Sequence, residues 1–302
     1  MLARLQQFTT LGGLAAALFW GWVCWEAGSP AGGVAVAILV VGGHALVLGL
    51  EFALLRQAHG DDPTPRATPA QLVRAWWGEV RAAPRVFCWR QPFRSRRWPD
   101  HLPGDARGRR GLLLVHGFVC NRGLWNPWLR RLHRQGVPFV AVDLEPVFGS
   151  IDDYIATLEQ AVQRLEQCTG LAPVVVAHSM GGLALRRWWV EQGDAARVHH
   201  AVTIGTPHHG TWLARFALSR NARQMRLSSG WLQALAAREG AGHAHRMTCF
   251  YGHCDNIVFP PATAALAGAD NRHLAEVAHV AMADHPEPWR EVQRHLAERV
   301  RP

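Results

Sequence analysis

The sequence predicts an α/β domain, with a mostly parallel sheet flanked by helices, preceded by a two-helix transmembrane hairpin. From Gly111 onward, short apolar runs alternate with longer segments of helical periodicity, as in parallel sheets whose strands are joined by helices. Before that point stand two apolar stretches of about 18 and about 20 residues, each long enough to cross a bilayer. We therefore divide the chain into a hairpin at residues 1–56, a linker and Arg/Trp-rich interfacial segment at 57–110, and an α/β domain at 111–302.

The first apolar stretch is Phe8–Trp25 and the second is Ala31–Leu50, with only the short turn Glu26–Pro30 between them. Because the link is so short, the two spans are expected to pair as a helical hairpin. Small residues at four-residue spacing, such as Gly12 and Ala16, would let the two backbones approach closely.

Arginines flank the hairpin and predict its orientation. Arg4 precedes the first span and Arg56 follows the second, so under the positive-inside rule both ends and the following domain face the cytoplasm. A signal peptide ending near Ala27 is the alternative, but no A-x-A cleavage pattern is present and the second apolar stretch would remain. His44 lies in mid-span, where an ionisable side chain is a functional candidate. We favour a neutral, structural histidine that satisfies itself on the partner helix.

The formal net charge is +9, from 32 basic residues, all of them arginine, and 23 acidic ones. Exclusive use of arginine is typical of a GC-rich, bacterial coding sequence, so the expected location is the inner (cytoplasmic) membrane of a bacterium. No nucleic-acid motif accompanies the charge, and many arginines follow the apolar stretches, so an anionic membrane surface is the expected partner. The cysteines lack CxxC spacing and are expected to be reduced, with a Cys249–Cys254 pair as the alternative.

Residues 57–110 connect the hairpin to the domain. Their first part, 57–70, has the Pro, Gly, Thr and Asp content of a linker. The next part, 71–100, mixes tryptophans with arginines and carries Leu72, Trp76 and Val80 on one helical stripe. Such a helix suits the headgroup layer of a membrane. Packing on the following domain is the alternative, and the sequence does not decide between the two.

The domain from Gly111 shows its strands as short apolar runs bounded by turn residues. Ser150, with Asp153 three residues later, forms a capping-box pattern that starts one of the helices between them. The strands are expected at 111–116, 138–143, 173–177, 200–204 and 247–252, with a further strand-like stretch around His273. The helices are expected at 121–135, from Ser150, from Met180, and from Trp289 to Val300.

Ser179 stands where an apolar strand ends and a helix begins, in the segment VVVAHSMGG. Ala177 lies two positions before it and Gly181 two positions after it, and small residues are needed there because the turn is too tight for larger side chains. The turn lifts the serine hydroxyl above the sheet and points a helix N-terminus toward it, which stabilises developing negative charge. The pattern predicts that Ser179 is a nucleophile.

The motif His116-Gly-Phe118 follows the first strand of the domain. When a serine attacks a carbonyl group, negative charge develops on the carbonyl oxygen, and two preorganised N–H groups can stabilise it. The main-chain amides of Phe118 and Met180 are placed by the sequence to do this. His116 itself is expected to be structural.

An acid and a base must follow the nucleophile along the chain. Asp255 comes just after the strand that ends at Gly252, at the carboxyl edge of the sheet, and is the predicted acid. His279 lies in the loop after the last strand-like stretch and is the predicted base, with His285 as the fallback.

The segments AHSMGG, HGF, CDNIV and TIGTPHHGT together resemble the small bacterial secreted lipases and the wider α/β-hydrolase lipases. The resemblance runs from Gly111 to the C-terminus. It implies an α/β-hydrolase fold and hydrolysis of carboxylic esters, with Ser179, Asp255 and His279 as the catalytic triad. It also implies an oxyanion hole at Phe118 and Met180.

The resemblance and the apolar hairpin together predict a membrane-anchored serine hydrolase, an esterase or lipase that cleaves a lipidic or small ester through an acyl-enzyme. Thioesterase, amidase and acyltransferase use the same triad and stay open, as does a non-catalytic membrane scaffold on the same fold. The secreted lipases lack the hairpin. Residues 212–239 are longer than a lidless domain needs and would suit a lid or an acyl pocket.

No cofactor and no metal are expected. His208 and His209 are adjacent, so their side chains point apart, and no cysteine or carboxylate completes a site at recognisable spacing. The sequence does not predict the oligomeric state.

Overall fold

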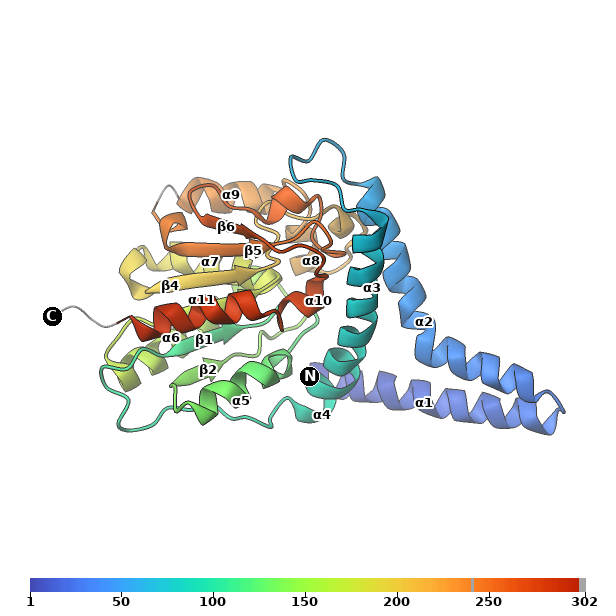
Figure 1. The fold of residues 1–302 in the computed structure, drawn as a ribbon. Coiled ribbons are helices and arrows are strands. Elements are labelled where there is room, and N and C mark those ends of the chain that lie inside the picture. The colour runs from blue at the N-terminus through green and yellow to red at the C-terminus, as the bar shows by residue number, and fades with distance from the viewer. Residues whose placement is uncertain (240–241, 299–302) are drawn as a thin grey trace.

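The computed structural model describes residues 1–239 and 242–298. Two long helices, α1 (Leu2–Glu26) and α2 (Pro30–Gln57), form an antiparallel arm that projects from a domain built on one sheet (Figure 1). The N-terminal part of α2 lies along α1, and its C-terminal part lies along α3 (Pro69–Ala83).

Both helices of the arm are longer than the apolar stretches that predicted them. By length and composition each could cross a membrane, and only 6% of the most apolar window of each is buried. Their exposed side chains are large and apolar, for example Leu18 and Leu46. An apolar surface of this extent is unusual against water and suits contact with lipid.

Within the described residues, the sheet has six strands, all parallel, in the order β2-β1-β3-β4-β5-β6. The alternation of side chains along each strand supplies two separate cores, since Leu113 and Val115 face one cluster while Leu112 and Leu114 face the other. The strands are β1 Leu112–Val115, β2 Phe139–Ala141, β3 Val174–His178, β4 His200–Ile204, β5 Met247–Tyr251 and β6 Asp270–His273. The predicted parallel α/β sheet is therefore confirmed.

Helices cover both faces of this sheet (Figure 1). One face packs against α6 (Ile155–Thr169) and α7 (Met180–Gln192), and the other against α5 (Asn126–Arg134) and α11 (Pro286–Ala297). The remaining described α-helices are α4 Gln91–Arg94, α8 Arg220–Gln224, α9 Gly230–Glu239 and α10 His279–Met282.

Local signals set the ends of these helices. Ser150 and Asp153 form the expected capping box, which starts a 3-10 turn that leads into α6. The last helix begins at Pro286 and not at Trp289, because His285 caps it and proline suits the first helical turn. Val300, where this helix was expected to end, lies outside the described residues.

The Arg/Trp-rich segment packs on the domain. Of the two alternatives, a helix in the headgroup layer of a membrane or a helix packed on the domain, the contacts match the second. Thr68 caps α3, whose buried residues Ala75 and Glu79 face α2 and α10. A π-helical segment, Pro84–Arg90, continues from α3 to α4. The Trp76 side chain donates its N–H to the Ala45 carbonyl of α2 at 2.9 Å, so α3 joins the arm to the domain.

Candidate active site

Ser179 occupies a strained turn between β3 and α7. Its φ is +54° and its ψ is −129°, a conformation that non-glycine residues adopt only where the surroundings enforce it. Its main-chain N–H donates to the Ile204 carbonyl at 2.9 Å, which holds the turn against β4. A Cβ on Gly181 would lie 2.5 Å from the His116 carbonyl oxygen, so only glycine fits there. These are the features that a nucleophile elbow requires.

Asp255 and His279 lie side by side at the same edge of the sheet. His279 Nδ1 donates to Asp255 Oδ2 at 2.9 Å, and both side chains are buried. Asp255 Oδ1 accepts the main-chain N–H groups of Ile257 and Val258, at 2.9 and 2.8 Å. Because a carboxylate only accepts, the proton of His279 is on Nδ1, and Nε2 is left as a base.

Burial disfavours the charged imidazole, but attraction and hydrogen bonding to Asp255 outweigh it and raise the pKa of His279 above its usual value. His279 is the first residue of α10 and does not lie in an open loop as expected. His285, the fallback base, accepts the Glu287 N–H as the cap of α11. Of the two histidines, the structure brings His279 to Asp255.

Ser179 and His279 line one cavity of about 250 Å³, together with Phe118. Among the described residues, no hydrogen bond joins the Ser179 hydroxyl to His279, a contact that often tightens only when substrate binds. Met180 is the first residue of α7, so its N–H has no intrahelical acceptor. Within the same described part, the Phe118 N–H donates no hydrogen bond to the protein. Neither predicted oxyanion donor thus has a described protein acceptor; Phe118 lines the cavity and Met180 follows Ser179 in sequence.

Gly117 lets the Phe118 loop approach the serine, since a Cβ on it would lie 2.7 Å from the Ser179 Cβ. His116 Nε2 accepts the Leu144 N–H at 3.0 Å, and its Nδ1 lies 2.9 Å from the Gly117 carbonyl. Burial lowers the pKa of His116, so it is a neutral residue that fixes the loop.

Three polar residues of this cavity escaped the sequence analysis. Glu51, near the end of α2, accepts a hydrogen bond from Asn256 Nδ2 at 2.6 Å. Asn256 Oδ1 in turn accepts the main-chain N–H of His279 at 3.2 Å. Glu79, on α3, accepts the Val280 and Ala281 N–H groups at 2.8 and 3.0 Å. Burial raises the pKa of Glu79 to about 7. Glu51 could have been noticed as the first acid after a long apolar stretch.

His178, next to Ser179, is a fourth missed residue of this cavity. Its Nε2 donates to the His279 carbonyl at 3.0 Å. Burial, together with repulsion from His279, lowers the pKa of His178 to about 3, so it stays neutral. It fixes the backbone of His279.

The segment 212–239, suggested as a lid or acyl pocket, folds into a 3-10 turn, α8 and α9. Its buried side chains Ala222, Met225 and Leu232 belong to a core cluster of the domain. No described residue of this segment lines the Ser179 cavity, whose outer wall is built instead by α2 and α3. His208 is buried against Thr203 and Arg186, which suits a structural role.

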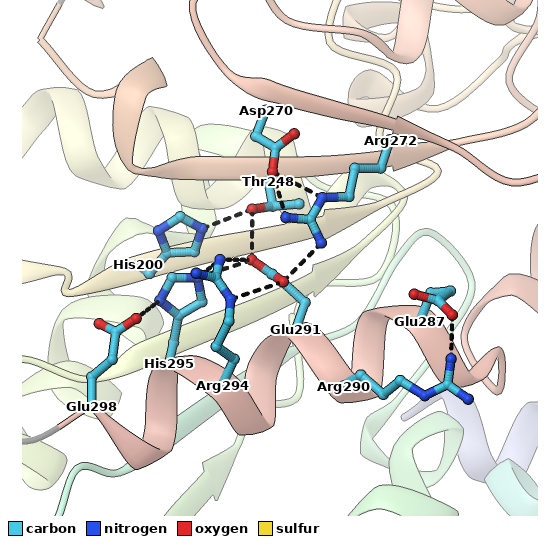
Figure 2. A network of polar contacts seen from close by, with 10 residues as sticks. All are labelled: His200, Thr248, Asp270, Arg272, Glu287, Arg290, Glu291, Arg294, His295 and Glu298. Atoms are coloured by element: carbon cyan, nitrogen blue, oxygen red, sulfur yellow. Dashed lines mark hydrogen bonds and ion pairs between the residues drawn. The ribbon is translucent and has the colours of Figure 1, made fainter.

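A second cluster of ionisable side chains joins α11 to the sheet (Figure 2). Glu291 lies at its centre and accepts from Arg272 at 2.8 Å, from Thr248 at 3.3 Å and from Arg294. Two groups here have the spacing of metal ligands, His200 with Glu291 and His295, and His199 with His295 and Glu298.

A metal ion in this cluster would face two guanidinium groups that already neutralise Glu291. Burial opposes the charged carboxylate, but Arg294 and Arg272 outweigh it and lower the pKa of Glu291 to about 2. His200 opens β4, so the cluster lies at the amino end of the strands, away from Ser179. Its chemistry is that of an ion-pair network that fastens α11.

A sequence model described as "Alpha/beta hydrolase family" matches residues 112–300. The Bacillus licheniformis lipase BlEst2 in its mature form is 18% identical, with a TM-score of 0.55, and the match covers 64% of this chain and 95% of that one. The propeptide form of the same lipase is 18% identical, with a TM-score of 0.55 and coverage of 67% and 53%. Aspergillus fumigatus lipase B is 19% identical, with a TM-score of 0.52 and coverage of 67% and 61%.

The chain thus spans nearly all of the mature bacterial lipase but less than two thirds of the other two chains. At identities this low, the likeness to the solved structures shows a shared fold. No curated protein matches the chain.

Proposed function

Because the chain belongs to the alpha/beta hydrolase family, we propose that it is a membrane-anchored serine hydrolase that cleaves carboxylic esters, an esterase or lipase. The observation that supports this most is the hydrogen bond from His279 to Asp255 in a buried position, in the cavity that also contains Ser179. The similar solved structures are described as lipases, which agrees with an ester substrate.

In the proposed mechanism, the Ser179 oxygen attacks the ester carbonyl carbon while His279 Nε2 takes the hydroxyl proton. The N–H groups of Phe118 and Met180 stabilise the negative charge on the carbonyl oxygen. The tetrahedral intermediate collapses, and the leaving alcohol takes the proton from His279. Water, deprotonated by the same nitrogen, then attacks the acyl-serine, and the acid leaves as Ser179 regains its proton. Asp255 holds His279 in the required tautomer and stabilises its charged form.

Membrane anchoring through α1 and α2 is part of the proposal. Two helices of sufficient length with exposed apolar faces support it. We propose residues 1–56 as the membrane hairpin, 57–110 as the connecting segment and 111–302 as the catalytic domain. Arg4 and Arg56 favour the cytoplasmic side of a bacterial inner membrane for that domain. A reporter fused after Pro302 that is active only in the periplasm would contradict the orientation.

Hydrolysis of 4-nitrophenyl esters by detergent-solubilised protein, together with labelling by a fluorophosphonate, tests the activity. Ser179→Ala is expected to abolish both turnover and labelling. Ser228→Ala is the matched control, because Ser228 also has a positive φ, of 48°, but is exposed. Labelling without ester turnover would indicate a thioesterase, amidase or acyltransferase. Folded protein that shows neither would contradict the enzyme and favour a scaffold.

A further inference from the structure

A second and larger cavity, of about 490 Å³, adjoins the Ser179 cavity. Its walls come from α1, α2, the end of α3 and the π-helical segment. The lining residues are Thr9, Thr10, Gly13, Leu14, Val40, Val41, His44, Ala83, Pro84, Phe87 and Cys88. Ala83 and Phe87 line both cavities, so the two meet at these side chains. Its volume lies in the range of roughly 300–1,000 Å³ that is typical of ligand sites.

The walls of this cavity offer little to a polar ligand. The Thr9 hydroxyl donates to the Gln6 carbonyl at 3.1 Å, and the two ring nitrogens of His44 lie 3.0 and 3.1 Å from the carbonyls of Val41 and Val80. The remaining lining is largely apolar, from Leu14 and Val40 to Phe87. With Thr9 and His44 beside the protein's own carbonyls, Thr10 as the remaining hydroxyl and an otherwise largely apolar lining, the cavity fits a hydrocarbon chain.

The outer side of this cavity lies between the two helices that we propose to span the membrane. Leu14 and Val41 line it and are also 49% and 62% exposed, so they belong both to the cavity and to the outer surface of the arm. In a bilayer that surface contacts lipid tails. The cavity is therefore open toward the hydrocarbon layer at one side and meets the Ser179 cavity at the other.

We propose that this cavity, formed by α1, α2 and the π-helical segment, is an acyl-chain site that admits a long-chain lipid ester sideways from the bilayer. The chain lies between the helices of the arm, and the ester group passes Ala83 and Phe87 to reach Ser179. This inference rests on the proposed function and names its substrate class, a membrane lipid with a long acyl chain. The hairpin then supplies part of the substrate site.

Adjacent positions on α1 give a matched test. Thr10 lines the cavity, whereas its neighbour Leu11 does not and is 55% exposed. Thr10→Trp is expected to lower the ratio of kcat/KM for 4-nitrophenyl palmitate to that for the butyrate at least tenfold in detergent. Leu11→Trp, with the same added side chain, is expected to leave this ratio at the wild-type value. Equal ratios in all three proteins, or equal losses in both variants, would overturn the acyl-chain site.

A binding experiment separates this inference from the esterase proposal. Palmitic acid carrying a diazirine and an alkyne is photocrosslinked to Ser179→Ala protein, and the labelled peptides are mapped. Label on residues 9–14 and 83–88 that is lost in Thr10→Trp and kept in Leu11→Trp supports the site, even if the wild type hydrolyses no ester. Label spread evenly over the exposed faces of α1 and α2 overturns it. Absence of serine-dependent turnover contradicts only the esterase.

Discussion

Replacement of Glu79 by glutamine tests how the segment before the domain holds the base in place. Glu79 belongs to α3, is 1% exposed, and accepts the N–H groups of Val280 and Ala281, at 2.8 and 3.0 Å. These residues directly follow His279 in α10. The carboxylate thus caps the short helix that begins at His279, from about 200 residues earlier in the sequence. A change at Glu79 is therefore expected to affect both the stability of the fold and the position of His279.

The pKa of Glu79 determines how its contribution to the free energy of unfolding depends on pH. Burial raises the pKa of Glu79 from 4.5 to about 7, and each unit corresponds to about 1.4 kcal/mol, so the ionised carboxylate costs the fold about 3 kcal/mol. Below pH 4.5 the group is protonated in both states and costs nothing. Between 4.5 and about 7 the folded state binds more protons, so the free energy of unfolding falls as pH rises; above 7 the loss is complete.

Glutamine cannot ionise, so Glu79→Gln removes this pH-dependent loss. It also replaces one acceptor oxygen by an NH₂ group, which leaves one buried N–H unpaired at a cost of roughly 1–3 kcal/mol. The variant is therefore expected to be less stable than wild type at pH 5 and as stable or more stable at pH 8.

Unfolding midpoints of detergent-solubilised wild type and variant, measured from pH 5 to pH 8, check this expectation. Glu287→Gln is the control, since Glu287 is 45% exposed at the side chain and pairs with an arginine, Arg290. Its offset from wild type is expected to change little over this range. If the difference between Glu79→Gln and wild type stays constant from pH 5 to pH 8, Glu79 is not the buried, reluctantly ionised group that its contacts imply.

Three further predictions concern catalysis. Asp255→Asn is expected to lower kcat for 4-nitrophenyl butyrate by about 10⁴-fold, because asparagine favours the wrong tautomer of His279; a loss under tenfold would contradict the assignment. The base acts only when it is neutral, and the pKa of His279 is raised above the ordinary histidine value of 6.5. The rising limb of the pH profile of kcat/KM is therefore expected to have its midpoint above 6.5, and a midpoint at or below 6.5 would refute this. Gly117→Ala adds a Cβ 2.7 Å from that of Ser179 and is expected to cost roughly 10²-fold in kcat, whereas Gly104→Ala, which meets open space, is expected to cost nothing measurable.

Much of the domain was predictable because its signals are local. A buried parallel strand is a continuous apolar run, so β1, β3 and β4 stand out in the sequence without knowledge of their neighbours. The order of these runs also puts their carboxyl ends at one edge of the sheet. Ser179 and Asp255 were therefore expected near each other from their places after β3 and β5 alone.

The outer wall of the site could not be predicted in the same way. The stripe of α3 shows that one face is apolar, but it does not say whether that face meets lipid, the arm or the domain. The contacts of Glu51 with Asn256 and of Glu79 with α10 join residues more than 200 positions apart, and no local pattern encodes them. The length of residues 212–239 suggested a lid or an acyl pocket, but none of them lines the Ser179 cavity, because surplus length does not specify where a segment packs.

The end of α2 also packs against the domain close to His279. Phe52 and Leu55 at the end of α2 share a buried cluster with Ala75 of α3 and with Phe259 and Ala278 of the domain. The sequence neighbour of Ala278 is His279, so the packing that fixes α2 against the domain also fixes the backbone of the base. If α1 and α2 span a bilayer, this cluster sets the distance and angle between the membrane and the Ser179 cavity. A flexible tether would leave that geometry free, whereas a membrane helix packed beside His279 would make the position of the membrane a part of the proposed active site.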